Sequence, residues 1–229
     1  MSKPLVDIEG LKFRWPKQEH ETLAIEQLRI ELLEHTFLQG SSGSGKTTLL
    51  NLLCGINLCS SGYLKVLGED LNAFNSQGRD QFRGRHLGII FQQFNLLPFL
   101  SVKENIELPC RFSKHRGTKV TDIHAEILRL LDALDLSESI LNQNVTELSA
   151  GQQQRVAACR AVIGSPELLI ADEPTSALDV QNRDNFVKLL FQEADKHGST
   201  IIFVSHDPAI GKHFPKQINL VDINQVGQT

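Results

Sequence analysis

The sequence has few cysteines, and none of them stands in a metal-binding spacing. The four residues Cys54, Cys59, Cys110 and Cys159 form no CxxC or CxxH pattern. No disulfide framework and no zinc site is therefore predicted from them, and they are interpreted as free thiols in a reducing compartment.

Long apolar runs and a strong net charge are also missing. No run approaches the roughly 18 apolar residues of a membrane helix, and the first ten residues lack the apolar stretch of a signal peptide. A formal net charge of -4 gives no electrostatic reason to expect a direct nucleic-acid partner. We expect a cytosolic chain that would reach a membrane only through a partner.

Short apolar runs alternate with helix-like stretches, which indicates an α/β protein with buried parallel strands. The runs that we interpret as strands are Thr36–Gln39, Leu87–Phe91, Leu168–Ala171 and Ile201–Val204. Polar residues follow each run, and ligands collect at the carboxyl ends of strands in open parallel sheets. We therefore expect these polar residues to converge on one site.

The middle of the chain is helical in character. Thr121–Leu136 has apolar residues at helical spacing, and Thr121 or Asp122 could cap its start. We predict one domain, 1–229, in which 1–92 and 165–229 form the core and 93–164 form a helical subdomain. The end, Gln217–Thr229, is expected to be a closing strand or hairpin.

A phosphate-binding motif lies between the first predicted strand and a predicted helix at Thr47–Leu53. It matches G-x-x-x-x-G-K-[ST] and is followed by Thr48; its residues are Gly40, Ser41, Ser42, Gly43, Ser44, Gly45, Lys46 and Thr47. Glycines let the backbone curl so that successive N–H groups point into one concavity, and the helix adds its positive end. Lys46 would reach the β- and γ-phosphates, and the Thr47 hydroxyl could ligate Mg²⁺. A flexible Gly/Ser linker would not explain the Lys-Thr-Thr end, so ATP binding is predicted.

Two adjacent carboxylates, Asp172 and Glu173, end the third predicted strand. Asp172 would hold the metal, directly or through water, and Glu173 would polarise the attacking water as a general base. Read alone, the pair could equally cap a helix before Pro174. The phosphate loop upstream favours the catalytic interpretation.

Four further segments occur in a fixed order around these motifs: Phe91-Gln92, Leu148–Gln152, Asp172–Asp179 and Val204–Asp207. Together they resemble the glutamine loop, LSGGQ signature, acidic strand with its D-loop, and switch histidine of ATP-binding-cassette (ABC) ATPases. The resemblance runs from about Val6 to Val221. It implies a P-loop NTPase with a mostly parallel core sheet, an N-terminal antiparallel β-subdomain and an inserted helical subdomain.

The resemblance also implies residue roles. Ser149, Gly151 and Gln152 would face the γ-phosphate of ATP held by a second copy, and Asp179 would lie at the dimer interface. Gln92 would sense metal and water and couple to a membrane partner. The implied catalytic residues are Glu173, His206, Gln92 and Lys46, and the implied metal-binding residues are Thr47, Gln92 and Asp172. Each motif, taken alone, also has a purely structural interpretation, such as Ser149 acting as a helix cap.

Trp15 and Ala150 stand at two further positions of the family's pattern. Trp15 stands where the family places an aromatic residue that stacks on adenine, although it could instead be an edge-strand aromatic packed on the sheet. Ala150 replaces the first glycine of the usual Gly-Gly pair. A first-turn helical residue carries a Cβ without strain, so the anion site would survive.

The resemblance predicts an ATPase, hydrolysing ATP to ADP and phosphate, that dimerises on ATP and Mg²⁺ to drive separate integral membrane permease subunits. It would lie on the cytoplasmic face of the inner membrane. Phe91–Asn105 most resembles the lipoprotein-releasing and macrolide-export group, which favours export or membrane extraction. The alternatives are an ABC ATPase acting on nucleic acid or the ribosome, a P-loop kinase or motor, and a nucleotide-gated regulator. The transported substrate would be selected by another polypeptide.

Overall fold

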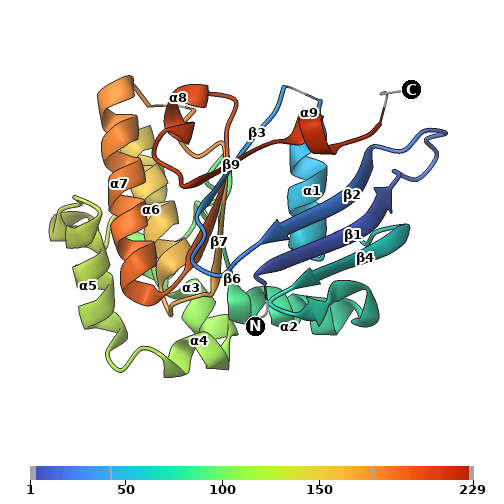
Figure 1. Ribbon diagram of the computed structural model, residues 1–229. Helices are drawn as coiled ribbons and strands as arrows, with labels where there is room; N and C mark the ends of the chain where they lie inside the picture. The colour runs from blue at the N-terminus through green and yellow to red at the C-terminus, as the bar shows by residue number, and fades with distance from the viewer. Residues whose placement is uncertain (1–3, 42, 177, 227–229) are drawn as a thin grey trace. The chain divides into compact units, whose positions relative to one another are not determined.

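The computed structural model of the chain describes residues 4–41, 43–176 and 178–226 (Figure 1). The chain divides into two compact units. The first consists of Met1–Arg83 and Ile202–Thr229, and the second of Gly84–Ile201. The boundaries fall inside α2 (Ser76–His86) and β8 (Thr200–Val204).

The first unit contains an antiparallel sheet in the order β2-β1-β4-β5. Its strands are β1 (Val6–Phe13), β2 (Leu23–Ile30), β4 (Ser61–Val66) and β5 (Glu69–Asp70). Alternate residues of β1 and β2 are buried, as expected for a sheet with one solvent face. The β1–β4 register shifts between Glu9 and Lys12, where a Cβ on Gly62 would lie 2.2 Å from the Gly10 carbonyl oxygen. The predicted N-terminal antiparallel β-subdomain is therefore present.

The same unit holds parallel strands in the order β8-β3-β9. Besides β8, these are β3 (Thr36–Gln39) and β9 (Lys216–Asn219), and the helices nearby are α1 (Lys46–Leu53), α8 (Pro208–Gly211) and α9 (Leu220–Ile223). The rings of Phe37, Phe203 and Phe214 lie with centroids 5.4 to 6.4 Å apart and form its aromatic core.

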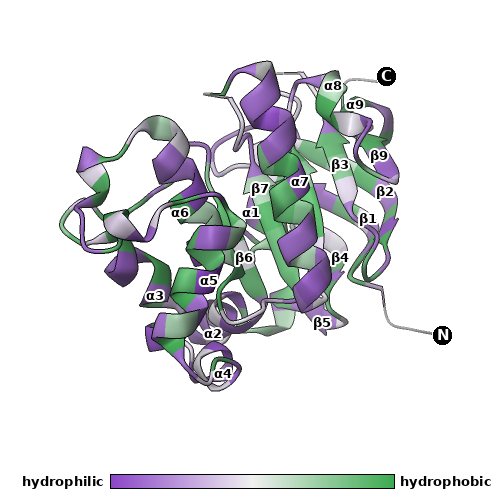
Figure 2. Ribbon diagram, turned by 90° about the vertical axis from the view of Figure 1, so that its left-hand side faces the viewer, coloured by the Kyte–Doolittle hydropathy of each residue, from purple (hydrophilic) through white to green (hydrophobic). Residues whose placement is uncertain are grey.

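The second unit is built on the parallel pair β6 (Leu87–Ile90) and β7 (Leu168–Asp172). Its helices are α3 (Val102–Phe112), α4 (Lys114–Thr118), α5 (Ile123–Ala133), α6 (Ala150–Val162) and α7 (Val180–His197). A Cβ on Gly88 would lie 2.2 Å from the Ala161 carbonyl oxygen, so α6 packs on β6 at backbone distance. In Figure 2 the ribbon of α7 carries both hydrophilic and hydrophobic turns, and Phe186, Leu190 and Ala194 supply its buried face.

Polar side chains cap the helices of the second unit. Ser101 and Ser149 each form a capping box with the residue three positions later, and Asp122 rather than Thr121 caps α5. No helix within the described ranges combines the length and apolar character needed to cross a membrane.

The predicted fold class and the strands named from the sequence are confirmed, and β3 has the predicted bounds. Of the two alternatives predicted for the chain end, a closing strand or a hairpin, the structure has the strand, β9. β9 pairs in parallel with β3 and leads into the short helix α9, so no hairpin closes the described part of the end. Asn219 caps α9 by accepting a hydrogen bond from the Val221 N–H, which turns the backbone into a helix instead of a return strand. The predicted helical subdomain, 93–164, lies within the second unit, and its boundaries stay a prediction.

Candidate nucleotide-binding site

The phosphate loop joins β3 to α1 in the first unit, with a backbone shaped by glycine. Gly43 and Gly45 have φ values of 78° and 101°, in the left-handed region that glycine adopts readily. Gly45 is the N-cap of α1, and no side chain caps the helix there. The first N–H groups of α1 are therefore available to an anion. Ser42 lies outside the described residues.

Side chains pack closely against two glycines of this loop. A Cβ on Gly40 would lie 2.5 Å from Ser44 Oγ, and a Cβ on Gly45 would lie 2.7 Å from Leu23 Cδ2. Ser44 Oγ itself is buried and has no hydrogen-bond partner within the described residues. A buried hydroxyl left unpaired is costly unless a ligand or water satisfies it. The curled loop and this hydroxyl fit a phosphate group.

Lys46 lies bent back over the loop. Its Nζ donates to the carbonyl oxygens of Gly40, at 2.7 Å, and Ser41, at 3.0 Å. The cation is thereby held over the concavity in which a phosphate would sit. Thr47 is exposed, whereas Thr48 is buried, so of these two threonines the first is the one accessible to a metal or phosphate.

Asn224, which no sequence motif identified, supports the loop from the C-terminal segment. Its Nδ2 donates to the carbonyl oxygens of Thr22 and Ser44, at 3.1 and 3.4 Å, and its Oδ1 accepts from the Ala24 N–H. One amide therefore ties the phosphate loop to the edge of β2. No local sequence signal could reveal this role, because the partners are about two hundred positions away.

His206 and Trp15 also belong to the first unit. The Ser205 N–H donates to the Leu38 carbonyl oxygen at 3.2 Å, which places His206 at the edge where β3 runs into the phosphate loop. His206 is exposed, as a residue that contacts a ligand should be. Trp15 is half-buried just beyond β1 and meets Phe13 edge-on, with centroids 5.1 Å apart. Its role in adenine binding stays a prediction.

Gln92, Asp172 and Glu173 lie at one edge of the β6–β7 pair. The parallel register pairs Ile90 with Ala171, so Gln92 follows β6 where Asp172 ends β7. Glu173 is only 9% exposed and has a φ of 46°. A non-glycine residue in the left-handed region is held there by its surroundings, and such positions cluster at functional sites. These three residues therefore follow the carboxyl ends of two paired strands, and their convergence on one ligand stays a prediction.

Arg160, which no sequence motif indicated, holds the segment after Gln92. Phe94 and Asn95 both have positive φ, and their carbonyl oxygens accept from Arg160 at 2.6 and 2.7 Å. Burial lowers the pKa of the Arg160 guanidinium. Because Arg160 is on α6, the glutamine loop is fastened to the helix that begins with the Ser149 signature.

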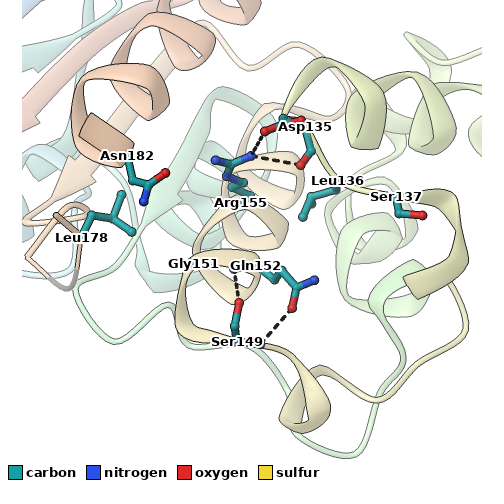
Figure 3. A pocket seen from close by; sticks show the side chains of 9 residues that line it. All are labelled: Asp135, Leu136, Ser137, Ser149, Gly151, Gln152, Arg155, Leu178 and Asn182. Carbon is teal, nitrogen blue, oxygen red and sulfur yellow. Dashed lines mark hydrogen bonds and ion pairs between the residues drawn. The ribbon is translucent and has the colours of Figure 1, made fainter. Parts of the chain in front are cut away.

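The N-terminus of α6 opens into a pocket of about 220 Å³ (Figure 3). Ser149 Oγ accepts from the Gln152 N–H at 3.3 Å, and Gln152 Oε1 accepts from the Ser149 N–H at 2.9 Å. Arg155 and Asp135 also line the pocket, and Arg155 donates a hydrogen bond to Asp135 Oδ2 at 2.7 Å. The lining residues are Asp135, Leu136, Ser137, Ser149, Gly151, Gln152, Arg155, Leu178 and Asn182.

Gly151 has more space than the packing of its own chain requires. Within the part of the chain that the structure describes, a Cβ there would meet only Leu178 Cδ2, at 3.8 Å, which is an ordinary contact. Ala150 begins α6 and carries its Cβ in the first turn, as expected. Asp179 caps α7 through the Asn182 N–H at 2.9 Å, and this hydrogen bond lowers the pKa of its carboxyl group.

Comparison with known proteins shows the family to which this chain belongs. The sequence profile described as "ABC transporter" matches residues 25–176. The chain is 37% identical to the "Uncharacterized ABC transporter ATP-binding protein YbbA" of Escherichia coli K12, over 95% of both chains. This chain belongs to the ABC transporter family. The family membership makes it an ATPase that binds ATP.

Two further similarities inform what this ABC ATPase does. It is 37% identical to the "Macrolide export ATP-binding/permease protein MacB 2" of Aeromonas hydrophila subsp. hydrophila, over 97% of this chain and 34% of that protein. A solved structure titled "Dimeric structure of a post-hydrolysis state of the ATP-binding cassette MJ0796 bound to ADP and Pi" superimposes with a TM-score of 0.83, at 31% identity over 93% of both chains. The predicted family and fold class are confirmed.

Proposed function

We propose that this ABC ATPase works as a pair of copies, each holding ATP between its own phosphate loop and the α6 N-terminus of the other. The observation that carries the proposal is the open pocket at Ser149–Gln152. It combines a helix N-terminus, a serine hydroxyl and a glycine whose missing Cβ leaves space that its own chain does not use. The ADP- and phosphate-bound structure of the similar cassette is titled as a dimer, which supports the same arrangement here.

Each predicted residue has a defined task in this arrangement. The phosphate loop and Lys46 bind the β- and γ-phosphates, and Trp15 stacks on adenine. Bound Mg²⁺ supplies positive charge against the phosphate oxygens, and Thr47, Asp172 and Gln92 are the residues that would hold it. These three residues offer a hydroxyl, a carboxylate and an amide oxygen, and Mg²⁺ prefers such hard oxygen ligands.

Glu173 and His206 act on the γ-phosphate side. Glu173 accepts a proton from the attacking water, and the turn after β7 holds its carboxylate in place. His206 senses the γ-phosphate from the end of β8. Asp179 fixes the start of α7 and contacts the second copy. Once hydrolysis has removed the γ-phosphate contacts, the closed pair loses its advantage over the open one, and this difference in affinity provides the work.

The work drives a membrane permease on the cytoplasmic face of the cell membrane, in the direction of export or membrane extraction. Two observations support this partner. The macrolide exporter relative is named as an ATP-binding/permease protein, and this chain matches only 34% of its length. The segment after Gln92 exposes Phe99, with 74% of its surface accessible, where a membrane subunit's helix could dock.

The Glu173→Gln variant tests this proposal, with Glu138→Gln as the matched control because Glu138 is exposed and outside the site. We expect Glu173→Gln to bind ATP, hydrolyse it poorly and accumulate a closed dimer, whereas the control hydrolyses ATP normally. Undiminished phosphate release by Glu173→Gln would contradict the role assigned to Glu173.

The same variant tests the partner. It is expressed in cells, extracted from membranes with detergent in the presence of ATP, and purified with whatever it binds. Integral membrane proteins should co-purify with the closed form and be lost when ATP is omitted. Recovery of ribosomes or DNA-binding proteins without a membrane protein would favour the alternative, an ABC ATPase with a non-transport partner.

A further inference from the structure

Two histidines and a glutamate come together in the second unit, and none of them belongs to the predicted nucleotide site. His86 ends α2, His115 is in α4, and Glu167 precedes β7. His86 Nδ1 lies 3.0 Å from Glu167 Oε2, and His115 Nε2 lies 3.7 Å from Glu167 Oε1. One ligand atom from each residue lies within 4.8 Å of the others. No spacing motif marks this cluster, since its members come from three separate segments.

The cluster lies at the opposite end of the strand pair from the catalytic carboxylates. His86 precedes β6 and Glu167 precedes β7, whereas Gln92 and Asp172 stand at the carboxyl ends of these strands. Asp172 lies five positions after Glu167 along β7, which is about 16 Å at the usual rise. The two sites therefore do not share ligands.

A buried arginine holds one side of the cluster rigid. Arg116, next to His115, is 2% exposed and donates to the carbonyl oxygens of Leu87 at 3.2 Å, Ala161 at 2.7 Å and Ile163 at 2.9 Å. These hydrogen bonds fix α4 to the end of α6 and the start of β6. His115 is consequently held beside His86, with their ring centroids 5.5 Å apart.

We propose that His86, His115 and Glu167 form a binding site for a divalent transition-metal ion, with Zn²⁺ as the best fit. Two imidazoles and a carboxylate are a donor set that Zn²⁺ takes, whereas Mg²⁺ and Ca²⁺ prefer oxygen ligands. Ligand atoms around tetrahedral zinc stand about 3.3 Å apart. The three side chains would need to move by no more than about 1.5 Å, and water completes the coordination.

Lys119 is the competitor for this site. Its Nζ lies 3.1 Å from Glu167 Oε1 and also donates to the Ser165 carbonyl oxygen at 2.9 Å. Its side chain is 30% exposed, so it can turn toward solvent when a metal takes its place on Glu167. The metal and the ammonium therefore exclude each other.

Titration calorimetry of the full chain with ZnCl₂ tests the proposal, after chelator treatment, without nucleotide and with excess Mg²⁺ to occupy oxygen-rich sites. We expect one zinc ion to bind per chain at this site. His115→Ala and Glu167→Gln should each weaken its binding about tenfold or more, since even an outer-shell change costs a metal site 10–100-fold. His124→Ala, which removes an exposed histidine outside the cluster, is the matched control and should bind zinc normally.

Lys119→Gln gives a prediction of opposite sign, because zinc affinity should rise when the competing charge is removed. Cobalt substitution adds a visible spectrum that reports low-coordinate nitrogen and oxygen ligands, and this spectrum should vanish in His115→Ala. Circular dichroism confirms that each variant is folded. Unchanged zinc affinity in the folded His115→Ala and Glu167→Gln variants would overturn the site, and unchanged affinity in Lys119→Gln would overturn the displacement of Lys119.

Discussion

Gly151→Ala should make the protein more stable and less active. Among the described residues, a Cβ at Gly151 meets only Leu178 Cδ2, at 3.8 Å, which is an ordinary contact. Replacing glycine by alanine in a helix stabilises it by about 0.5–1 kcal/mol, because the unfolded chain loses less backbone entropy on folding. Gly151 lies in the first turn of α6, so the lower end of that range is expected.

The loss of activity has a different origin. If the α6 N-terminus of one copy contacts the γ-phosphate held by the other, an added methyl group must push the two apart. A displacement of about 1 Å at a reacting centre can cost about 100-fold in rate, so we expect at least a tenfold fall in turnover.

Urea denaturation of the purified chain and phosphate release at saturating Mg²⁺ and ATP measure the two effects. Ala150→Gly is the matched control, since it changes one Cβ in the same turn with the opposite sign. It should lower stability slightly and leave turnover intact. A Gly151→Ala protein that is destabilised, or that hydrolyses ATP at the parent rate, would refute the reasoning.

The remaining predictions concern two charged side chains. Arg160→Met should unfold more easily, by about 2 kcal/mol, because the Phe94 and Asn95 carbonyl oxygens lose a charged donor. It should also lower ATP turnover by freeing the segment after Gln92, whereas a turnover equal to the parent's would show that this segment holds its position without Arg160. Burial disfavours ionisation of Glu193, but hydrogen bonds from His197 and Arg129 outweigh it and lower its pKa from 4.5 to about 2. Between about pH 5 and pH 2 the unfolded state therefore binds more protons than the folded state. The Glu193 carboxylate contributes about 3 kcal/mol of stability above pH 5, and this contribution should be lost as the pH falls toward 2. Urea denaturation at several pH values should show that the free energy of unfolding of Glu193→Gln depends less on pH than that of the parent. An unchanged pH dependence would contradict the stabilising role given to the Glu193 carboxylate.

Much of the fold could be read from the sequence because the decisive signals are local. Short apolar runs predicted β3, β6, β7 and β8, and the Lys-Thr-Thr sequence predicted the start of α1. The Ser149 and Asp122 caps were also local, since a cap involves residues only three positions apart. The chain end was predicted to be a closing strand or a hairpin, and the structure has the strand, β9, whose parallel pairing with β3 is set by distant packing.

The sequence by itself determined the phosphate loop, the acidic strand end and the α6 signature, because each is a contiguous segment whose residue types dictate its own backbone shape. Only the tertiary structure decided which residues support those segments. Asn224 reaches Ser44, Arg160 reaches Phe94, and His86, His115 and Glu167 gather at one place although they come from separate parts of the chain. Such contacts depend on how strands and helices pack, and packing leaves no fixed spacing in the sequence.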